Sequence, residues 1–407
     1  MSERTKKILF AVFFILFSLA MGYALYWMLF RSQATLPEQQ PSEQELTGNL
    51  PTAASGTIGI TPDVQPTNLP SAGEVPTAPG AETQTGTRLL RDGISQALTP
   101  SPDGNGARFY NPEDGRFYRV SADGTITLLG EKQFFNVDKV DWGKQTDQAI
   151  LNFPDGTNVF YDFTEQRQVI LPKHWEDFNF SSNDQQVAAK SIGVDEANRF
   201  LIVSKPDGSE AKAIEPLGDN SGLAHVAWAP GGQIIAYSQT GQPQGNNYEE
   251  ILMIGQNHEN FRSLIAPGQD FLPSWSPTGK QMLFSVWNQD SGNRPNLWIS
   301  SGEPSTMGAG RKNLHIQTWA DKCVWADDSN LYCGVPQGLP INAGIQRSDF
   351  ATYPDDVYHI NLLNGTFQKI NTPDQTHPIR QPVLNRDHSK FIFADTETGK
   401  IYSYDIQ

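Results

Sequence analysis

The chain of 407 residues repeats one short pattern seven times, and this repetition limits the possible folds more than any other feature. The clearest copy runs from Pro273 to Phe284 and reads Pro-Ser-Trp-Ser-Pro-Thr-Gly-Lys-Gln-Met-Leu-Phe. It predicts a strand ending at Trp275, a tight turn and an apolar return strand. Pro277 fixes φ for the turn, and Gly279 tolerates the positive φ that hairpin loops need.

Each copy places an apolar anchor about nine residues before an apolar return position. The pairs are Pro100 with Phe109, Trp142 with Leu151, Phe180 with Ala189, Trp228 with Tyr237, Trp275 with Phe284, Trp325 with Cys333 (one residue fewer) and Leu384 with Phe393. A third alternating run follows each hairpin, and short turns such as Asn364-Gly365 lead to a fourth strand. Four short strands per unit, with units roughly 40–60 residues apart, predict an all-β protein, a seven-bladed β-propeller, with six or eight blades as alternatives. A β-sandwich with coincidental turns fits seven matched anchors less well.

The seventh unit reaches Gln407 directly after its third strand. A missing outer strand would leave a long sheet edge exposed. The segment Thr87–Leu90, which is set off by the turn at Asp92-Gly93, is a candidate for the missing strand. We therefore expect this segment to complete the last blade and close the ring.

The hairpin Trp-Ser-Pro-Thr-Gly-Lys, with its relatives at the other anchors, resembles the WD-repeat-like motif of the TolB-type propellers over about residues 87–407. The motif is specific for the fold and says little about function. TolB itself combines a six-bladed propeller with an α/β domain and has no membrane helix, whereas this chain has seven units and no such domain. The resemblance therefore implies the fold and does not carry over the role of TolB in envelope complexes.

The N-terminal residues predict a membrane anchor. Arg4, Lys6 and Lys7 precede residues 8–30, which are 23 residues without a charge. This length spans a bilayer core of about 30 Å, and the basic residues in front of it place the N-terminus in the cytoplasm. Cleavage as a signal peptide after Ala20 is the alternative, but the apolar run continues to residue 30 and is too long for one. We therefore expect residues 1–31 to hold a single-pass signal anchor in the cytoplasmic membrane.

Residues 32–86 predict a disordered linker. They include eight prolines and neither an aromatic residue nor Lys or Arg, so they cannot bury enough apolar surface to offset their ordering entropy. Beyond residue 31 the chain carries 44 acidic and 26 basic side chains. That balance repels nucleic acid and suits a propeller, residues 87–407, that lies outside the cytoplasm.

The two cysteines predict a disulfide. Cys323 and Cys333 lie on the first two strands of the sixth unit. A three-residue loop between Ala326 and Asn330 places them directly opposite each other, where the Cβ atoms are close enough for a bridge. Two buried free thiols are the alternative, and an oxidising compartment favours the bridge.

No linear motif indicates catalysis, a metal or a cofactor. The sequence has no Gly-x-Ser-x-Gly elbow and no His-Glu-x-x-His, and its seven histidines are scattered singly. We therefore assign no catalytic residue, metal ligand or cofactor. An enzyme such as a hydrolase or a quinoprotein-type dehydrogenase remains the alternative, built at the central channel from residues on the segments that enter each unit. These residues are His225, Asp270, Trp319, Asp321, His377 and Arg380.

One face of the propeller is the predicted binding surface. The loops between second and third strands are long only in three consecutive units, at Gln239–Glu249, Trp287–Pro295 and Gly334–Asp355. Equivalent loops of neighbouring blades lie on one face, and these carry residue types enriched at interface hot spots. The candidate binding residues are Tyr248, Trp287, Arg294, Arg347, Phe350 and Tyr353. The sequence thus predicts a membrane-anchored scaffold of the cell envelope that binds a protein or glycan, unless these aromatic side chains fold back onto the blade edges.

Overall fold

The computed structural model describes Met21 and residues 87–242, 244–245, 247–370 and 376–406. The chain divides into two compact units, residues 1–73 and 74–407, and the fold described here belongs to the second. The predicted membrane anchor (except Met21) and linker lie outside the described residues. Within the described ranges, no helix has the length and apolar character required to span a bilayer.

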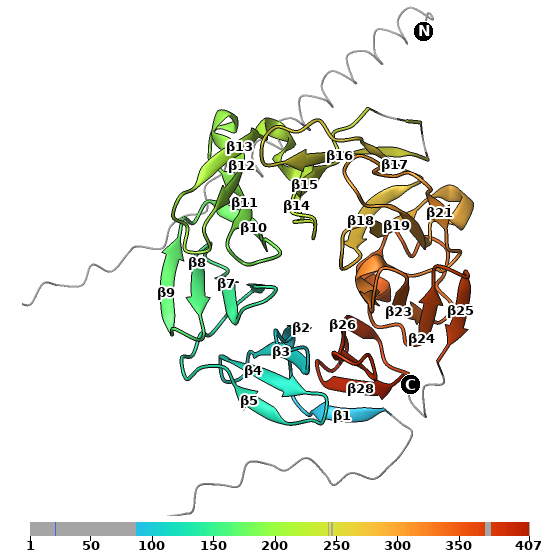
Figure 1. Cartoon of the computed structure of the whole chain (residues 1–407), viewed down its shortest axis with the longest axis horizontal. Coiled ribbons are helices and arrows are strands. Elements are labelled where there is room, and N and C mark those ends of the chain that lie inside the picture. The colour runs from blue at the N-terminus through green and yellow to red at the C-terminus, as the bar shows by residue number, and fades with distance from the viewer. Residues whose placement is uncertain (1–20, 22–86, 243, 246, 371–375, 407) are drawn as a thin grey trace, which may run out of the picture. The chain divides into compact units, whose positions relative to one another are not determined.

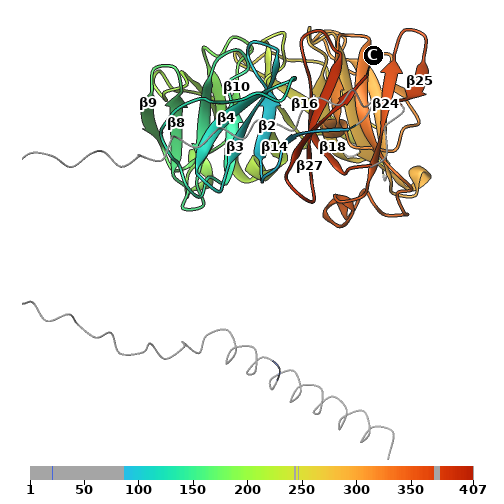
Figure 2. The same ribbon diagram turned by 90° about the horizontal axis from the view of Figure 1, so that it is seen from below.

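The second unit is a seven-bladed β-propeller, as the repeat predicts, and each blade is a four-stranded antiparallel sheet (Figure 1). Figure 2 shows the same blades from the side, with loops at both ends of the strands. The strands of blades one to three, from the innermost to the outermost, are β2 (Gln96–Pro100), β3 (Gly106–Asn111), β4 (Arg116–Ser121) and β5 (Ile126–Leu128); β6 (Lys139–Trp142), β7 (Gln148–Asn152), β8 (Asn158–Asp162) and β9 (Arg167–Leu171); β10 (Trp175–Phe180), β11 (Val187–Ile192), β12 (Arg199–Ser204) and β13 (Lys212–Pro216).

Blades four to seven follow in chain order around the ring. Their strands are β14 (Ala224–Val226), β15 (Ile234–Ser238), β16 (Glu249–Gly255) and β17 (Leu264–Ala266); β18 (Gln269–Trp275), β19 (Gln281–Trp287), β20 (Pro295–Ser301) and β21 (Lys312–Asn313); β22 (Cys323–Trp325), β23 (Asn330–Pro336), β24 (Asp355–Asn361) and β25 (Thr366–Lys369); β26 (Ile379–Leu384), β27 (Lys390–Asp395), β28 (Ile401–Asp405) and β1 (Arg88–Arg91). Short 3-10 helices occupy the connections, at η1 (Glu196–Asn198), η2 (Gly218–Leu223), η3 (Gln289–Ser291), η4 (Ala320–Lys322) and η5 (Arg347–Phe350).

The N-terminal strand β1 closes the ring, as the sequence predicts. It pairs antiparallel with the C-terminal strand β28, with Arg88 opposite Ser403 and Leu89 opposite Tyr402. Figure 1 shows the two strands side by side although they lie at opposite ends of the propeller sequence. Leu90 is buried in the apolar cluster that also contains Leu98 of blade one. The strand therefore supplies both backbone pairing and apolar contact at the junction of blades seven and one.

The repeated hairpin forms for the local reason that its residues indicate. Trp275 pairs with Met282, and the amide of Gly279 donates to the carbonyl of Ser276 across 2.8 Å, which closes the turn. Gly279 has φ of +77°, a conformation that costs little only without a Cβ. The hairpin is therefore encoded by the turn residues and by the apolar positions on either side.

The innermost strands of four blades contain a bulge that the sequence pattern does not predict. Pairing with the second strand shifts register in blades one, three, five and seven, and a non-glycine residue adopts positive φ at each shift. These residues are Ala97, Asp177, Asp270 and Gln381. Two of them reach the next blade, since the side chains of Asp177 and Gln381 accept the backbone amides of Val226 and Leu98, each at 2.9 Å. At two of the bulges, a polar side chain thus hydrogen-bonds to the neighbouring blade.

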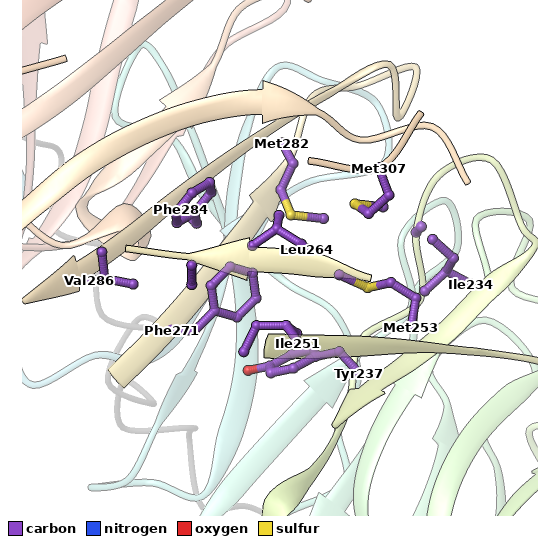
Figure 3. Packing of buried hydrophobic residues seen from close by; sticks show 12 residues of the cluster. Ile234, Tyr237, Ile251, Met253, Leu264, Phe271, Met282, Phe284, Val286 and Met307 are labelled. Carbon is purple, nitrogen blue, oxygen red and sulfur yellow. The ribbon is translucent and has the colours of Figure 1, made fainter. Parts of the chain in front are cut away.

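The apolar core lies between adjacent blades. In the junction of blades four and five, Tyr237, Ile251 and Met253 face Phe271 and Phe284, and all five side chains are buried (Figure 3). Comparable clusters fill the other junctions around the ring. Each blade is therefore stable only against its neighbours, because its two faces are covered by the adjoining sheets.

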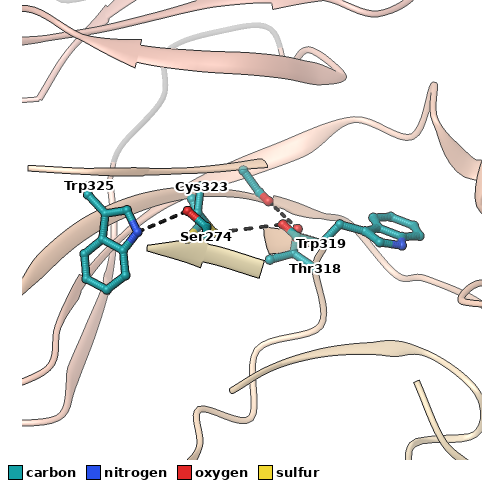
Figure 4. Close-up of a disulfide and its surroundings, with 7 residues drawn as sticks. Ser274, Thr318, Trp319, Cys323 and Trp325 are labelled. Atoms are coloured by element: carbon teal, nitrogen blue, oxygen red, sulfur yellow. Dashed lines mark hydrogen bonds between the residues drawn. A yellow bond between two sulfur atoms is a disulfide. The ribbon is translucent and has the colours of Figure 1, made fainter. Parts of the chain in front are cut away.

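A disulfide joins the first two strands of blade six. Cys323 lies opposite Cys333 in the register of β22 and β23, and their sulfur atoms are bonded. The neighbouring Trp325 donates its indole N–H to the hydroxyl of Ser274, 3.2 Å away in blade five (Figure 4). The bridge thus lies where blade six contacts the preceding blade.

Ring closure predicts the effect of removing β1. A chain that starts at residue 80 retains β1, whereas a chain that starts at residue 95 lacks it. We expect the shorter chain to melt at least about 5 °C lower, since burial of a leucine such as Leu90 alone contributes about 2–5 kcal/mol. Differential scanning calorimetry of the two chains measures this. Equal melting temperatures would contradict closure by β1.

The disulfide predicts the result of an alkylation experiment. The unfolded chain without reductant takes up no iodoacetamide, and after reduction it takes up two equivalents, at Cys323 and Cys333. Reduction lowers the free energy of unfolding by about 2–4 kcal/mol, because the bridge limits the unfolded chain. Intact-protein mass spectrometry provides the count, and two labels on the unreduced chain would refute the bridge.

Candidate partner-binding face

Three loops that follow the second strands of blades four, five and six lie on one face of the propeller. Their described residues are 239–242, 244–245, 247–248, 288–294 and 337–354. Antiparallel strands alternate in direction, so the segment that enters the first strand of a blade lies on this same face. Trp319 and Asp321, directly before β22, therefore belong to the same surface as the three loops.

The loops of blades five and six are joined to each other by hydrogen bonds. The amide of Asn342 donates to the carbonyl of Gly292 across 2.9 Å, and the amide of Gly344 donates to the carbonyl of Asn293 across 2.8 Å. The Asn293 side chain also donates to the Asn342 side chain at 2.8 Å. We refer to residues 288–294 and 337–354 together as the platform. The hydrogen bonds between its two loops hold them in place.

Two of the predicted binding residues hold the platform together. The guanidinium Nε of Arg294 donates to the carbonyl of Leu339 across 2.7 Å. Trp287 lies under the loop of blade six, because a Cβ added to Gly344 would meet the Trp287 Cβ at 2.6 Å. Only glycine allows this close approach. Arg294 and Trp287, both partly buried, therefore support the platform.

An aromatic cluster supports the other half of the platform. Trp319 is only 1% exposed and packs with the buried side chains of Leu339 and Ala343, and Phe350 covers this group. The ring of Phe350 lies 5.4 Å from that of Tyr353 in an edge-on arrangement. Phe350 and Tyr353 are both partly buried. In this region the aromatic side chains fold back onto the blades, which is the alternative that the sequence left open.

Arg347 connects the platform to the segment that enters blade six. One terminal nitrogen of its guanidinium donates to both carboxylate oxygens of Asp321, at 2.7 and 2.6 Å. The guanidinium carbon also lies 5.1 Å from the centre of the Trp319 ring, a cation–π distance. Because both partners belong to blade six, this contact fixes the position of η5 on its own blade.

A buried ion pair anchors the C-terminal end of the platform. The Lys322 ammonium lies 2.6 Å from a carboxylate oxygen of Asp355, and the two side chains are 6% and 0% exposed. The same oxygen accepts the backbone amide of Ile379 in blade seven at 2.6 Å. Burial raises the pKa of Asp355 to about 6, and the Lys322 charge and the Ile379 amide oppose this rise. The pair thus connects the base of the platform to the next blade.

The most exposed apolar side chains of the platform were not identified from the sequence. Ile341 and Ile345 are 64% and 52% exposed, and Tyr248 on the loop of blade four is 47% exposed. Of the six predicted residues, Tyr248 alone is exposed, while the other five are partly buried. Two isoleucines within a loop rich in Gly, Pro and Asn were a signal that could have pointed to this surface, because such loops are normally small and polar.

A polar cluster lies beside the start of blade four. It includes His225, one of the residues that the sequence placed at the central channel. A ring nitrogen of His225 is 3.0 Å from the side-chain oxygen of Gln239, and its ring stacks on Tyr237 with centroids 5.1 Å apart. Burial, opposed by a hydrogen bond from Gln239, raises the pKa of Glu249. One oxygen of Glu249 is buried and has no hydrogen-bond partner among the described atoms.

Further carboxylates surround this cluster. Burial raises the pKa of Asp270. The charge of Arg347 opposes this rise, and the charge of Asp321 adds to it. Burial likewise raises the pKa of Tyr237, helped by the carboxylates of Asp177, Asp270 and Glu249. No three His, Cys, Asp or Glu side chains are arranged as metal ligands within the residues that the structure describes.

His377, another residue on an entering segment, has a structural partner. Its Nδ1 lies 2.7 Å from a carboxylate oxygen of Asp395, and both side chains are buried. The ring stacks on Tyr402 with centroids 4.1 Å apart. Arg380 donates to the carbonyl of Ser95 at 3.2 Å. His377 therefore links two segments of blade seven, and Arg380 links blade seven to the segment that enters blade one.

No family model matches the sequence. Among curated proteins, the chain is similar to dipeptidyl-peptidase 5 of Porphyromonas gingivalis, with 22% identity over 285 residues. The match covers 60% of this chain but only 39% of that protein, so the chain spans about two fifths of its length.

Solved structures resemble the chain in fold. The β-propeller domain of Cps50 (Swd1) from Myceliophteria thermophila matches with a TM-score of 0.52 and 11% identity, covering 79% of this chain and all of that one. An oligogalacturonate lyase in complex with manganese matches with a TM-score of 0.52 and 13% identity, covering 79% of this chain and 93% of that one. At these identities the likeness shows the fold alone. It confirms a resemblance to WD-repeat and TolB-type propellers at the level of the fold.

The buried ion pair at the base of the platform predicts a mutational asymmetry. Lys322→Met leaves the Asp355 carboxylate buried without a counter-charge, and we expect it to lower the free energy of unfolding by about 3–5 kcal/mol at pH 7. The double variant with Asp355→Asn removes that charge, while its amide oxygen still accepts from Ile379. It should recover most of the loss. Urea unfolding measures both, and a double variant as unstable as the sum of the two singles would contradict this account.

The pKa of Asp355 adds a pH dependence with a defined sign. Its value of about 6 lies above the ordinary carboxyl value near 3.9, so between these values the folded chain binds more protons here than the unfolded chain. The contribution of Asp355 to stability therefore falls as the pH rises from about 4 to about 6. The penalty of Lys322→Met should accordingly be smaller at pH 5 than at pH 7, and an equal penalty would contradict it.

Proposed function

We propose that this chain is a membrane-tethered binding module, and that its propeller recognises a protein outside the cytoplasm through the platform. The observation that carries the proposal is the order of the platform. Four hydrogen bonds between the loops of blades five and six hold it in one arrangement, including those from Asn342 and Gly344. A surface that is ordered before binding loses little conformational entropy when a partner arrives.

The exposed side chains favour a protein over a glycan as the partner. Ile341 and Ile345 present aliphatic groups to solvent, and Tyr248 adds an amphipathic ring on the neighbouring blade. Aliphatic side chains gain free energy by contact with another apolar surface, at about 25 cal/mol per Å² buried. Glycan recognition depends mainly on hydrogen bonds and aromatic faces, and the aromatic rings of the platform are partly buried in its support.

The sequence supports the location. Residues 8–30 predict a membrane anchor with the N-terminus in the cytoplasm, and residues 32–86 predict a flexible linker. A propeller attached in this way would meet partners close to the outer surface of the cytoplasmic membrane. The acidic balance beyond residue 31 opposes nucleic acid as a partner.

An enzyme is the second candidate. It is favoured by the cluster of His225, Gln239 and Glu249, in which Gln239 contacts both the imidazole and a carboxyl of raised pKa. The similarity to a peptidase and to a lyase is compatible with this candidate, although it covers 39% of the peptidase and reflects only the fold of the lyase. If the cluster is catalytic, Glu249→Gln should abolish a hydrolase or lyase activity that Glu397→Gln in an exposed turn of blade seven retains.

Photo-crosslinking tests the binding function. A benzoylphenylalanine at position 341 of the full chain, expressed in its own host, should form an adduct with one protein, whereas the same group at the exposed position 363 on the opposite face should not. The variant Ile345→Glu should reduce that adduct at least tenfold, because a charge replaces apolar contact. Its melting temperature should be unchanged, since the side chain is exposed. An adduct that forms equally from both positions, or survives Ile345→Glu, would contradict the proposal.

A further inference from the structure

Blade four has an open strand edge. Strand β16 covers Glu249–Gly255, and β15 pairs with it along its inner side as far as Gly255. On the outer side, pairing with β17 ends where Ile251 lies opposite Leu264. In the described part of the chain, no strand pairs with the outer side of residues 252–255. The described backbone hydrogen bonds include none to the outward groups of these residues, and the side chains of Glu259 and Phe261 approach this edge at Gly255.

Blade five shows how such an edge is usually covered. Its outer strand β21 is even shorter than β17, but the connection that precedes it folds back onto β20. The amide of Ser301 donates to the carbonyl of Ala309 at 2.9 Å, and the amide of Gly308 donates to the carbonyl of Ser301 at 3.0 Å. In blade four, the described backbone hydrogen bonds include none between residues 256–263 and residues 252–255. Within that connection Glu259 accepts from the amide and the side chain of Asn257, and Phe261 packs against the core between blades four and five.

A cavity of about 440 Å³ lies along this open edge. It is lined by residues from the end of blade three, from β14, β15 and β16, and from the connection that follows β16. Its walls combine apolar groups with two carboxylates, and the residues used below are Glu215, Leu217, Leu252, Ile254, Glu259 and Phe261. Leu252 is 36% exposed although it lies within a strand. The site is therefore both a groove and an unpaired edge.

The charges around the groove indicate its ligand. The side chain of Glu215 is 44% exposed, and its only described ion-pair partner is the exposed His258, 3.5 Å away. Glu259 lies at the other wall and caps Asn257. Lys and Arg are absent from the residues that line the cavity. A ligand that carries basic side chains is thus attracted from both walls.

We propose that this groove binds an extended peptide of a partner protein, in which apolar and basic residues alternate, as an added strand on the edge of β16. The peptide backbone hydrogen-bonds to the open edge, its apolar side chains contact Leu217 and Leu252, and its basic side chains lie near Glu215 and Glu259. Strand addition of this kind obtains affinity from the main chain and specificity from alternate side chains.

The linker of this chain does not suit the groove. Residues 32–86 contain neither Lys nor Arg and several glutamates, so the two carboxylates would repel them. The occupant is therefore a segment of another protein. This site is separate from the platform and does not depend on the function proposed for it.

A synthetic peptide of alternating lysine and valine, six residues long and labelled with fluorescein, tests the proposal by fluorescence anisotropy with the full chain. The dissociation constant should rise at least tenfold when alternate peptide nitrogens are methylated, because methylation removes the donors that strand pairing needs. A peptide in which glutamate replaces lysine should not bind. Equal binding of the methylated peptide would overturn strand addition.

Variants of the protein locate the site. Glu215→Gln should weaken binding of the lysine peptide about fivefold, and Leu252→Asn should weaken it by removing an apolar contact without changing the charge of the groove or the Glu259 cap. Glu397→Gln, which removes one exposed carboxylate in blade seven, is the matched control and should bind like the wild type. The Ile345→Glu variant of the platform should also bind normally, so failure of one proposal is distinguishable from failure of the other.

Hydrogen exchange gives a readout that charge alone does not change. On addition of the lysine peptide, the amides of residues 252–255 should exchange at least tenfold more slowly, while those of the paired residues 249–251 should change little. Protection elsewhere, or none in β16, would overturn the assignment of the edge.

Discussion

The pairing of β1 with β28 is the constraint on which the rest of the structure depends. Every blade buries its two faces against its neighbours, so the ring is stable only when all junctions are closed. The last junction is closed by residues from the two ends of the propeller sequence, with Leu90 buried in one cluster with Leu98 and Val383. All other junctions join blades adjacent in sequence. Closure therefore fixes the ring as a whole and makes it a rigid support for its loops.

The fold could be predicted from the sequence because the residues that specify each hairpin are close together in the chain. Each hairpin is specified within about ten residues by an anchor, a turn and a return position, as Trp275, Gly279 and Phe284 show. The opposition of Cys323 and Cys333 follows from the same hairpin geometry. Even the closing strand could be inferred, since a seventh unit without an outer strand required one. Seven copies of the hairpin pattern predict a propeller, whereas a single copy predicts only a hairpin.

The candidate site was predicted less well because its order depends on contacts between distant residues. The face and its three long loops were identified, but most of the chosen aromatic and basic residues form the support of the platform. Gly344 approaches Trp287, and Arg294 reaches Leu339, contacts that no local pattern reveals. For the same reason the sequence did not reveal the bulges at Asp177 and Gln381, whose side chains hydrogen-bond to the next blade. It did not reveal the open edge of β16 either.

The central claim is that the platform is ordered before any partner binds, and amide hydrogen exchange of the free protein tests it most directly. The amides of Asn342 and Gly344 donate to carbonyls of blade five, so they should exchange at least a hundredfold more slowly than the unpaired chain. Exchange of Asn342 and Gly344 at the rate of an unstructured peptide would contradict the account.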